Sequence, residues 1–465
     1  MDEKKKKFQV PHVYIILMFV ILIFAALTYI IPAGQYDFVT LDNGRSVVDA
    51  STYHHVDSTP VTLMQLFSAI PRGMIEVAQI IFFIFIVGGS FGVVQHTRAI
   101  EAGMGRLIVS LKEKTIIIIP IVMIAFSLGG SVFGMAEETI PFIPIFVALM
   151  VAAGYDSLTG TAVVLCGAGA GFAGAFINPF TIQVAQGIAE IPLLSGMQFR
   201  IAMYCCMVLL AIVFVMLYAH KVQKDPSKSI VHEIDKHRED GINLEDLPEF
   251  NGRRKAILVV FLLSIVLLVY GVIQFGWYMD EIAALFLGLS VVAAIIDGMG
   301  FNTYAEVLGR GMADVAGGAL VVGFARGILV VMTDGNILHT ILHSASAALT
   351  GLPAMVSAVG MYIFQCLLNF IVPSGSGQAS VSMPILAPLA DLVGVTRQTA
   401  VIAFQLGDGI SNIFTPTSGY FMAGLGLAKI PWSKWAKWIL PLIGLEYLLG
   451  LVFVVIAQSI HLGPF

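Results

Sequence analysis

The stretch FGMAEETIPF, residues 133–142, places two adjacent glutamates, Glu137 and Glu138, near the centre of a long apolar block. From Thr115 to Tyr155 they are the only charged side chains. Ionisable groups inside a membrane are costly, and they usually mark a functional site. The block therefore contains a polar interruption that both the fold and the function have to explain.

The composition of the chain is that of a membrane protein. Of its 465 residues, 58% are hydrophobic and 12% are charged, and the mean hydropathy is +0.90. Soluble domains carry about 25% charged residues. Apolar runs of about 20 residues, enough for one helix to cross a bilayer, recur along the chain. We expect an all-α polytopic protein in contact with the lipid bilayer, with little room for a soluble domain.

Nine segments are predicted to span the membrane. They lie at residues 12–32, 74–96, 159–188, 196–219, 256–274, 281–298, 312–333, 399–426 and 438–459. Two further apolar blocks, 115–155 and 354–393, have polar centres, and the second centre reads PSGSGQAS, residues 373–380. Irregular backbone at membrane depth is tolerated only where protein buries it or a watery cavity faces it. Both blocks are therefore predicted to be re-entrant hairpins whose tips face a cavity.

The distribution of lysine and arginine predicts the orientation. With the N-terminus inside, 20 of the 25 basic residues, among them Lys4–Lys7 and Arg106, fall in cytoplasmic segments, and Arg326 falls within a span. The four predicted to lie outside are Arg45, Arg72, Arg200 and Arg397. This asymmetry follows the positive-inside rule. It places the C-terminus outside and makes the charged stretch 221–255 a cytoplasmic linker.

The two halves of the chain, 1–220 and 256–465, resemble each other at offsets of 238 to 240 residues. The matching pairs are RGMIEVA (72–78) with RGMADVA (310–316), PIFVALMVAAGY (144–155) with PILAPLADLVGV (384–395), and AEIP (189–192) with AKIP (428–431). The second half carries one extra span, 281–298, which inverts its orientation. An inverted-topology repeat with two opposed hairpins is expected. In that architecture the substrate site lies near the midplane, where broken helices meet.

Each half also contains a second irregular stretch, GAGAGFAGAFINPFT (167–181) and GDGISNIFTPTSG (407–419). Dense Gly and Pro weaken a helix and free backbone groups for other partners. The alternative is that glycine simply lets membrane helices pack closely. Both interpretations stay open for the Gly-Ala run, whereas the Ser, Asn and Thr side chains of the second stretch favour a transport site.

Three motifs resemble a known family. The opening FQVPHVYIILMFVILIFAALTYIIPAGQY (8–36), the FGMAEETIPF hairpin and SNIFTPTSGY (411–420) are similar to the YfcC-type family of the C4-dicarboxylate anaerobic carrier group, within the ion transporter superfamily. The resemblance runs along essentially the whole chain. It implies a scaffold domain, a mobile transport domain that holds both hairpins, homodimers, elevator-like motion and a bacterial cytoplasmic membrane.

The resemblance is less specific for the substrate. Members of the family are described as dicarboxylate carriers or as basic amino acid antiporters. Dicarboxylate relatives in the superfamily carry Ser-Asn-Thr at both hairpin tips, whereas the first tip here reads Ala-Glu-Glu-Thr, residues 136–139. This departure disfavours a simple dicarboxylate site.

The glutamate pair has two possible roles. Carboxylates are favoured at the N-terminus of a helix, so the pair could cap the returning arm near Thr139. Two adjacent carboxylates do not both stay ionised in an apolar site without a nearby cation. Adjacent helical side chains point about 100° apart. We therefore expect one glutamate to face the substrate, while the other caps the arm or binds an ion.

Two further charged residues within predicted spans are candidates for the site. Arg326 either pairs with Asp334 or Asp408, or clamps a substrate carboxylate. Asp408, between two glycines, either binds Na⁺ or a proton as the coupling ion, or pairs with Arg326. A Na⁺ site near Asp408, Asn412 and Asn178 is one possibility, with no other metal or cofactor expected. Glu137 is the other candidate for ion coupling.

Neutral hydrogen-bonding side chains complete the candidate site. Serines at a helix N-terminus suit a carboxylate, although they also serve as ordinary caps. The predicted substrate-binding residues are Glu137, Glu138, Thr139, Asn178, Arg326, Ser374, Ser376, Gln378, Ser411, Asn412, Thr415 and Thr417. No phosphate-cradling loop, nucleophile motif or nucleic-acid-binding pattern occurs, so neither an enzyme nor an ATP-driven pump is expected.

The sequence thus predicts a secondary active transporter. One acidic tip and one tip with neutral donors suit a small zwitterion with a cationic side chain, such as arginine exchanged for ornithine. The alternative is a four-carbon dicarboxylate carried with Na⁺ or H⁺. A channel is a third possibility, which the broken helices in both halves disfavour.

Overall fold

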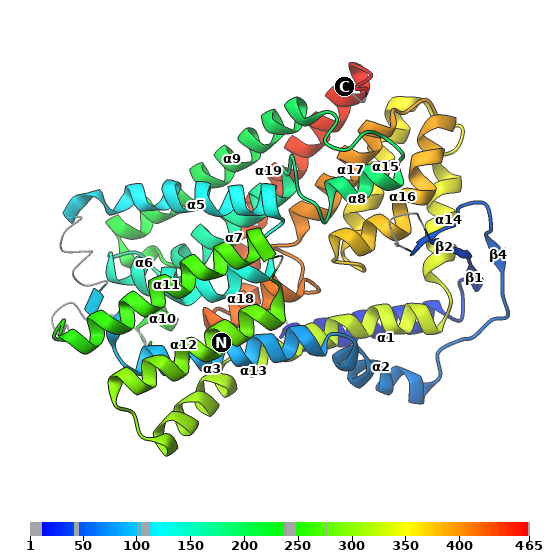
Figure 1. Ribbon diagram of the computed structural model, residues 1–465. Helices are drawn as coiled ribbons and strands as arrows, with labels where there is room; N and C mark the ends of the chain where they lie inside the picture. The colour runs from blue at the N-terminus through cyan, green and yellow to red at the C-terminus, as the bar shows by residue number, and fades with distance from the viewer. Residues whose placement is uncertain are drawn as a thin grey trace, which may run out of the picture.

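The computed structural model describes residues 12–40, 46–100, 102–103, 112–236, 238, 248–275 and 277–463. The predicted cytoplasmic residues Lys4–Lys7 and Arg106, the predicted external Arg45, and part of the linker, 239–247, lie outside the described residues. The described part is mainly helical (Figure 1). Within it, six helical segments are long and apolar enough to cross a bilayer: Ala78–His96, Thr115–Phe133, Met197–Lys224, Met279–Asp297, Phe301–Asp334 and Trp432–Ser459.

The first group of helices packs around one long helix, α13. Its members are α1 (Val13–Leu27), α2 (Leu63–Glu76), α3 (Ala78–His96), α11 (Gly252–Phe275), α12 (Met279–Asp297) and α13 (Phe301–Asp334). Helices α1, α2 and α3 all contact α13, while α12 joins α3 to α11. We call this set the α13 group. It runs along the lower part of Figure 1.

The second group packs around α7 and α17, which contact each other. Its members are η1 (Lys112–Ile117), α5 (Ile118–Leu128), η2 (Gly129–Phe133), η3 (Glu137–Phe142), α6 (Ile143–Ala152), α7 (Ser157–Ala173), α8 (Ile182–Ile188), α9 (Met197–Lys224), α15 (Ala354–Asn369), α16 (Gly375–Leu392), α17 (Arg397–Ser411), α18 (Gly419–Leu427) and α19 (Trp432–Ser459). Every residue of α7 is buried. We call this set the α17 group.

Glycines allow close contact inside the α13 group. A Cβ placed on Gly73 would lie 2.7 Å from the carbonyl oxygen of Gly323, and one on Gly311 would lie 2.8 Å from that of Gly88. Residues near 73 therefore face residues near 323, whereas residues near 88 face residues near 311. The α2–α3 segment and α13 consequently run antiparallel, with their backbones almost touching.

The two irregular stretches expected from the sequence are breaks between helices. The predicted spans 159–188 and 399–426 are not continuous, because α7 ends at Ala173 before α8 begins, and α17 ends at Ser411 before α18 begins. Each gap contains a proline, Pro179 or Pro416, which has no backbone N–H to donate. The prediction of breaks in these stretches is confirmed.

Both predicted hairpin segments are helix–turn–helix units. In the first, α5 continues into the π-helical η2, and the chain then turns through Gly134 into η3 and α6. In the second, α15 ends at Asn369 and α16 begins at Gly375. The returning arm of the first unit starts with a 3₁₀ helix because Pro141 and Pro144 interrupt the regular hydrogen bonding there.

A short β segment, which the all-α prediction missed, lies between α1 and α2. Strand β1 (Gly34–Gln35) pairs with β4 (His54–His55), and β2 (Phe38–Thr40) pairs with β3 (Ser46–Val48), both antiparallel. The segment contacts α14 (Leu338–Leu349), where the Tyr53 ring stacks on His343 at 3.8 Å between centroids. Two short helices, η4 (Pro226–Lys228) and α10 (His232–Asp235), occupy the described part of the linker.

The outer surface of the helices is apolar. Leu209 and Leu217 of α9, Val266 of α11 and Leu448 of α19 are all more than half exposed. An apolar surface of this extent marks contact with another apolar phase, which for helices of this length is a lipid bilayer.

Candidate functional site

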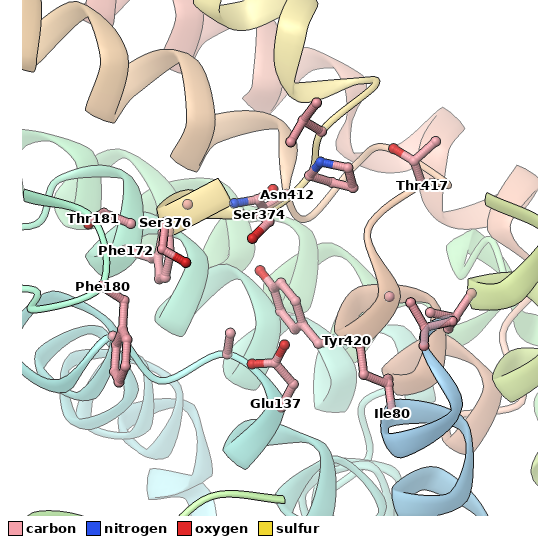
Figure 2. Close-up of a pocket in the computed structure, with 18 of the residues that line it drawn as sticks. Ile80, Glu137, Phe172, Phe180, Thr181, Ser374, Ser376, Asn412, Thr417 and Tyr420 are labelled. Carbon is pink, nitrogen blue, oxygen red and sulfur yellow. The ribbon is translucent and has the colours of Figure 1, made fainter. Parts of the chain in front are cut away.

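A cavity of about 680 Å³ lies where the two helix groups meet (Figure 2). Helix α18 packs against α13 beside it, and η3 contacts α3 and α12. The cavity is lined by residues of both hairpin tips, both helix breaks and the α13 group. They include Gly134, Glu137, Glu138, Phe180, Thr181, Tyr278, Arg326, Ser374, Ser376, Asn412, Thr417 and Tyr420. Ligand sites in proteins are cavities of about 300–1,000 Å³. The cavity is therefore large enough for a small metabolite.

The first tip turns at Gly134, where the backbone is left-handed with φ of +71°. A Cβ at this position would be strained and would lie 2.6 Å from Oδ1 of Asn178, so the turn requires glycine. After the turn, Thr139 donates its hydroxyl hydrogen to the carbonyl oxygen of Ala136 at 2.5 Å. Thr139 thus stabilises the tip from behind and does not line the cavity.

The two glutamates of this tip have different surroundings. Glu138 is only 6% exposed, and its Oε2 accepts a hydrogen bond from the backbone N–H of Ala136 at 3.0 Å. Glu137 is half-buried and lies beside Tyr420 in the cavity (Figure 2). Both glutamates line the cavity, but only the carboxylate of Glu138 also secures the turn. That the pair divides a binding role and a structural role stays a prediction.

The second tip presents the start of α16. Ser374 is the N-cap of this helix, and its hydroxyl oxygen accepts a hydrogen bond from the N–H of Gly377 at 3.4 Å. Ser376 follows in the first turn and also lines the cavity. Gln378 points away from it, because its amide donates to the carbonyl oxygen and to Oε1 of Gln365 on α15. The N–H groups of a helix start favour an anion such as a carboxylate.

Asp408 lies behind the second tip and outside the cavity lining. It is fully buried, and neither carboxylate oxygen has a hydrogen-bond partner among the described residues. A Cβ on Gly375 would lie 3.2 Å from its Oδ2 and would overlap the methyl group of Thr181, whose hydroxyl is also buried and unpartnered. A buried carboxylate without a partner is strongly unfavourable unless a cation or a proton neutralises it.

Asn369, which sequence reasoning missed, connects the ends of α15 and α17. Its Nδ2 lies within hydrogen-bond distance of the carbonyl oxygen of Asp408, of Ser411 Oγ and of Asn412 Oδ1, at 2.7, 2.6 and 3.0 Å. Ser411 is thereby held behind the cavity, whereas Asn412 lines it. A buried asparagine in an otherwise apolar hairpin arm was the signal that could have indicated this role.

Other predicted residues serve the helix breaks. Oδ1 of buried Asn178 accepts the N–H of Phe180 at 2.9 Å, so this side chain shapes the first break beneath the tip. In the second break, the hydroxyl groups of Thr415 and Thr417 lie 2.8 Å apart, and of the two only Thr417 lines the cavity. The structure thus brings together seven of the predicted residues at the cavity: Glu137, Glu138, Arg326, Ser374, Ser376, Asn412 and Thr417.

Arg326 lines the cavity but pairs with neither acid named from the sequence. Its Nε donates to Oε2 of Glu76 on α2 at 2.7 Å, and both side chains are about 40% exposed. Asp334 instead pairs with Arg72, and Asp408 has no ion pair among the described residues. Of the alternatives left open for Arg326, the ion pair with Asp334 or Asp408 does not form, because α2 packs alongside this part of α13 and supplies Glu76. A clamp on a substrate carboxylate stays a prediction.

Aromatic residues of the cavity were also missed. Tyr420 is the residue directly after the second irregular stretch, 407–419, and Phe180 lies inside the first break. Neither carries the polar signal that identified the other candidates. Thr181 lies inside the first irregular stretch, 167–181, and Glu76 lies inside the repeated stretch 72–78, but the sequence alone did not distinguish them from structural residues.

Comparisons with known proteins agree on the family. The family model for C4-dicarboxylate anaerobic carriers, DcuC, matches residues 10–459. A protein of Escherichia coli strain K12 described as "Putative basic amino acid antiporter YfcC" is 37% identical over 97% of both chains. An uncharacterized protein of Haemophilus influenzae Rd is 30% identical over 99% of both chains.

Two solved transporter structures share a weaker likeness. The YdaH transporter of Alcanivorax borkumensis has a TM-score of 0.44 and 16% identity, with 97% of this chain and 99% of that chain covered. MtrF of Neisseria gonorrhoeae has a TM-score of 0.44 and 17% identity, with coverage of 97% and 96%.

Long apolar helices around a cavity with broken helices and polar tips define the class as a multi-pass membrane protein. The protein belongs to the C4-dicarboxylate anaerobic carrier family, because the family model and the curated relatives cover nearly all of its sequence. It is a transporter of this family.

Proposed function

We propose that the protein is a secondary active transporter that exchanges basic amino acids, arginine for ornithine, across the bacterial cytoplasmic membrane. The observation that carries the proposal is the single cavity that joins the acidic first tip to the donor-rich second tip. A zwitterion with a cationic side chain has a carboxylate for the helix start at Ser374 and a cation for Glu137. The name of the Escherichia coli relative points in the same direction.

The charges at the cavity support a cationic substrate. Among the described lining residues, Glu137 and Glu138 are acidic and Arg326 is basic, but Arg326 is already paired with Glu76. The cavity therefore has a net negative charge when both glutamates are ionised. A dicarboxylate would bring two more negative charges beside them, which like-charge repulsion opposes. Arg326 remains close enough to assist the substrate carboxylate by exchanging its partner.

Asp408 is the proposed coupling-ion site, with a proton or Na⁺ as the ion. The support is its complete burial without a partner, next to Thr181 of the first break and Gly375 of the second tip. The ion and the substrate would then both contact the second tip. Binding of the ion would stabilise the tip conformation that binds the substrate, and binding of the substrate would stabilise the conformation that binds the ion. Asn412 and Asn178 are the nearby amide side chains that we expect to contribute if the ion is Na⁺.

The proposed architecture is an inverted repeat that moves as an elevator. The 238-residue offset relates Gly73 to Gly311 and position 326 to position 88. A Cβ on Gly73 would lie 3.1 Å from the backbone of Arg326, and one on Gly311 would lie 2.8 Å from that of Gly88, so these two close contacts of α13 with α2 and α3 are equivalent under the repeat. This supports a two-fold axis within the α13 group, which we propose as the scaffold. The α17 group, with both re-entrant hairpins, is the proposed transport domain. Homodimers, an internal N-terminus and an external C-terminus complete the proposal.

A Na⁺- or H⁺-coupled four-carbon dicarboxylate carrier is the second candidate. The description of the family and the serine-lined second tip favour it. In that case, Glu137 and Glu138 would bind the coupling ions, and Arg326 would leave Glu76 to bind a substrate carboxylate. A channel is a third, weaker candidate.

Ligand-induced thermal stabilisation of the purified full-length protein tests these alternatives. The panel contains arginine, ornithine, lysine, succinate, fumarate and malate, each with and without Na⁺ and at two pH values. We expect arginine and ornithine to raise the unfolding temperature, because binding to the native state stabilises it by mass action. Proteoliposomes loaded with ornithine should then take up labelled arginine by counterflow.

Each competing outcome identifies a different function. Stabilisation by succinate and not by basic amino acids would reject our substrate and support the dicarboxylate carrier. Single-molecule currents far faster than a carrier can cycle would support a channel. Stabilisation by arginine that depends on Na⁺ at constant pH would identify Na⁺ as the coupling ion, whereas dependence on pH alone would identify the proton.

A further inference from the structure

Three aromatic side chains from three different elements line the cavity together with Glu137. Phe180 belongs to the first helix break, Tyr420 is in the first turn of α18, and Tyr278 precedes α12. The ring of Phe180 lies against the turn of the first tip, since a Cβ on Gly134 would be 2.8 Å from its Cδ2. Tyr420 lies beside Glu137 (Figure 2), and Tyr278 immediately precedes α12, which contacts η3, the helix that begins at Glu137.

Packing alone does not account for two of these rings, whereas Tyr420 is only 8% exposed and is packed against the protein. Phe180 is 50% exposed and Tyr278 is 41% exposed, although both stand in a protein whose interior could bury them. Leaving aromatic surface exposed in a cavity sacrifices the free energy that burial would provide. In Figure 2, Tyr420 rises between Glu137 and Ser374, and Phe180 faces the same space from the other side. The carboxylate thus shares the cavity with aromatic ring surfaces.

We propose that Glu137, Tyr420, Phe180 and Tyr278 form a cage for a guanidinium group, and that Tyr420 makes the site prefer arginine to ornithine and lysine. The inference rests on the proposed function and specifies its substrate. A guanidinium is planar and weakly hydrated, so it stacks on aromatic faces while its N–H groups bind a carboxylate in a bidentate way. A primary ammonium is compact and strongly hydrated, and it gains less from the rings.

The cage is built from both helix groups. Tyr278 comes from the α13 group, while Phe180 and Tyr420 come from the α17 group. The three rings therefore line one cavity with Glu137 only when the groups are placed as they are here. A guanidinium in the cage stabilises this arrangement over one in which the groups have moved apart, because it contacts both sides at once.

Dissociation constants of the purified full-length protein for arginine, ornithine and lysine, measured by calorimetry, test the cage. The variants are Tyr420→Leu, Tyr420→Phe and Phe180→Leu. Phe172→Leu is the matched control, because Phe172 lines the same cavity near Ser376 and away from Glu137 (Figure 2). The readout is the ratio of the ornithine to the arginine dissociation constant within each variant, which does not depend on the fraction of protein that is folded.

We expect the wild-type protein to bind arginine about tenfold more tightly than ornithine, within the range of desolvated cation–π interactions. Tyr420→Leu and Phe180→Leu should reduce that ratio to about two or less, since a ring face is lost from the cage. Tyr420→Phe and Phe172→Leu should keep the wild-type ratio. If Tyr420→Leu does not fold, Phe180→Leu gives the same comparison, because a half-exposed ring contributes little to stability.

Different failures have different meanings. A ratio that stays unchanged in both Tyr420→Leu and Phe180→Leu would overturn the cage and leave the proposed exchange of basic amino acids standing. Wild-type protein that binds ornithine as tightly as arginine would also overturn the cage and leave the proposed exchange standing. Wild-type protein that binds none of the three amino acids would overturn the proposed function and the cage together.

Discussion

At the scale of single residues, the glutamates of the first tip are adjacent in the chain but differ in their surroundings. The carboxylate of Glu138 is buried and accepts a backbone N–H, which stabilises its charge inside the protein. The carboxylate of Glu137 faces a cavity of about 680 Å³ that aromatic rings also line. A substrate cation at Glu137 would neutralise that carboxylate. We therefore propose the binding role for Glu137 and the structural role for Glu138.

Substitution of each glutamate by glutamine separates these roles. Glu137→Gln should weaken arginine binding by more than about tenfold, because a charge-assisted hydrogen bond becomes a neutral one. It should leave the unfolding temperature almost unchanged. Glu138→Gln should cost about 1 kcal/mol of stability, typical of a weakened cap. Calorimetry measures the affinity, and thermal unfolding measures the stability.

Glu306→Gln, at an exposed position of α13, is the control and should change neither quantity. Wild-type arginine affinity in Glu137→Gln, combined with lost binding in stable Glu138→Gln, would show that the two roles are reversed.

Several residues of the site could be predicted because polar groups in apolar segments are costly and therefore conspicuous. This reasoning found Glu137, Ser374 and Asn412. It missed Tyr420 and Phe180, because an aromatic side chain is unremarkable in a chain with 58% hydrophobic residues. It also missed the partner of Arg326, which is 250 residues away in the sequence. Such a pairing depends on which helices pack together, and a single sequence carries no record of that.

At the scale of secondary-structure elements, the glycine run of α7 has a packing role. A Cβ on Gly171 would overlap the backbone of Ser127 on α5, and one on Gly167 would lie 3.0 Å from the backbone of Met123. The helices α5 and α7 therefore approach each other closely along the first hairpin. Of the two interpretations left open by the sequence, close packing accounts for this run, while the break itself begins after Ala173.

Gly171→Ala should destabilise the protein, since its methyl group has no space and backbone atoms would have to move. Overpacking of this kind costs about 1–3 kcal/mol, which should lower the unfolding temperature by several degrees. Gly187→Ala is the matched control, because Gly187 in α8 has open space around its Cβ position. It should be neutral or slightly stabilising.

Equal unfolding temperatures of the two glycine variants would contradict close packing between α5 and α7.

The helix breaks and the turns of both hairpin segments were accessible to prediction because glycine, proline and polar residues interrupt apolar runs there. The strands between α1 and α2 were not, since strands of two or three residues are too short to show an alternating pattern.

At the scale of the whole molecule, the two helix groups do not coincide with the two halves of the sequence. The α13 group takes α1 to α3 from the first half and α11 to α13 from the second, and the α17 group likewise takes helices from both. Sequence matching predicted two related halves. It did not reveal this exchange, because each half contributes one part to either side of the cavity. The boundary between the groups is where an elevator would move.

An ion pair crosses this boundary away from the cavity. Nζ of Lys429, between α18 and α19, lies 3.5 Å from Oδ2 of Asp314 on α13. In a background without the four native cysteines, Lys429→Cys and Asp314→Cys can be joined by a short bifunctional thiol reagent. If the groups slide past each other during transport, the link should abolish nearly all arginine–ornithine counterflow, and reduction should restore it. Counterflow in proteoliposomes before linking, after linking and after reduction measures this.

The pair Arg72→Cys and Asp334→Cys provides the matched control. Both residues belong to the α13 group, and their side chains are in direct contact, with Nη2 and Oδ1 2.9 Å apart. A link inside one group leaves relative motion of the two groups free, so counterflow should be the same before and after linking. Undiminished counterflow with the Lys429–Asp314 positions linked would show that the groups stay fixed at this boundary. Alternating access would then have to come from the hairpin tips alone, opening and closing around a stationary cavity.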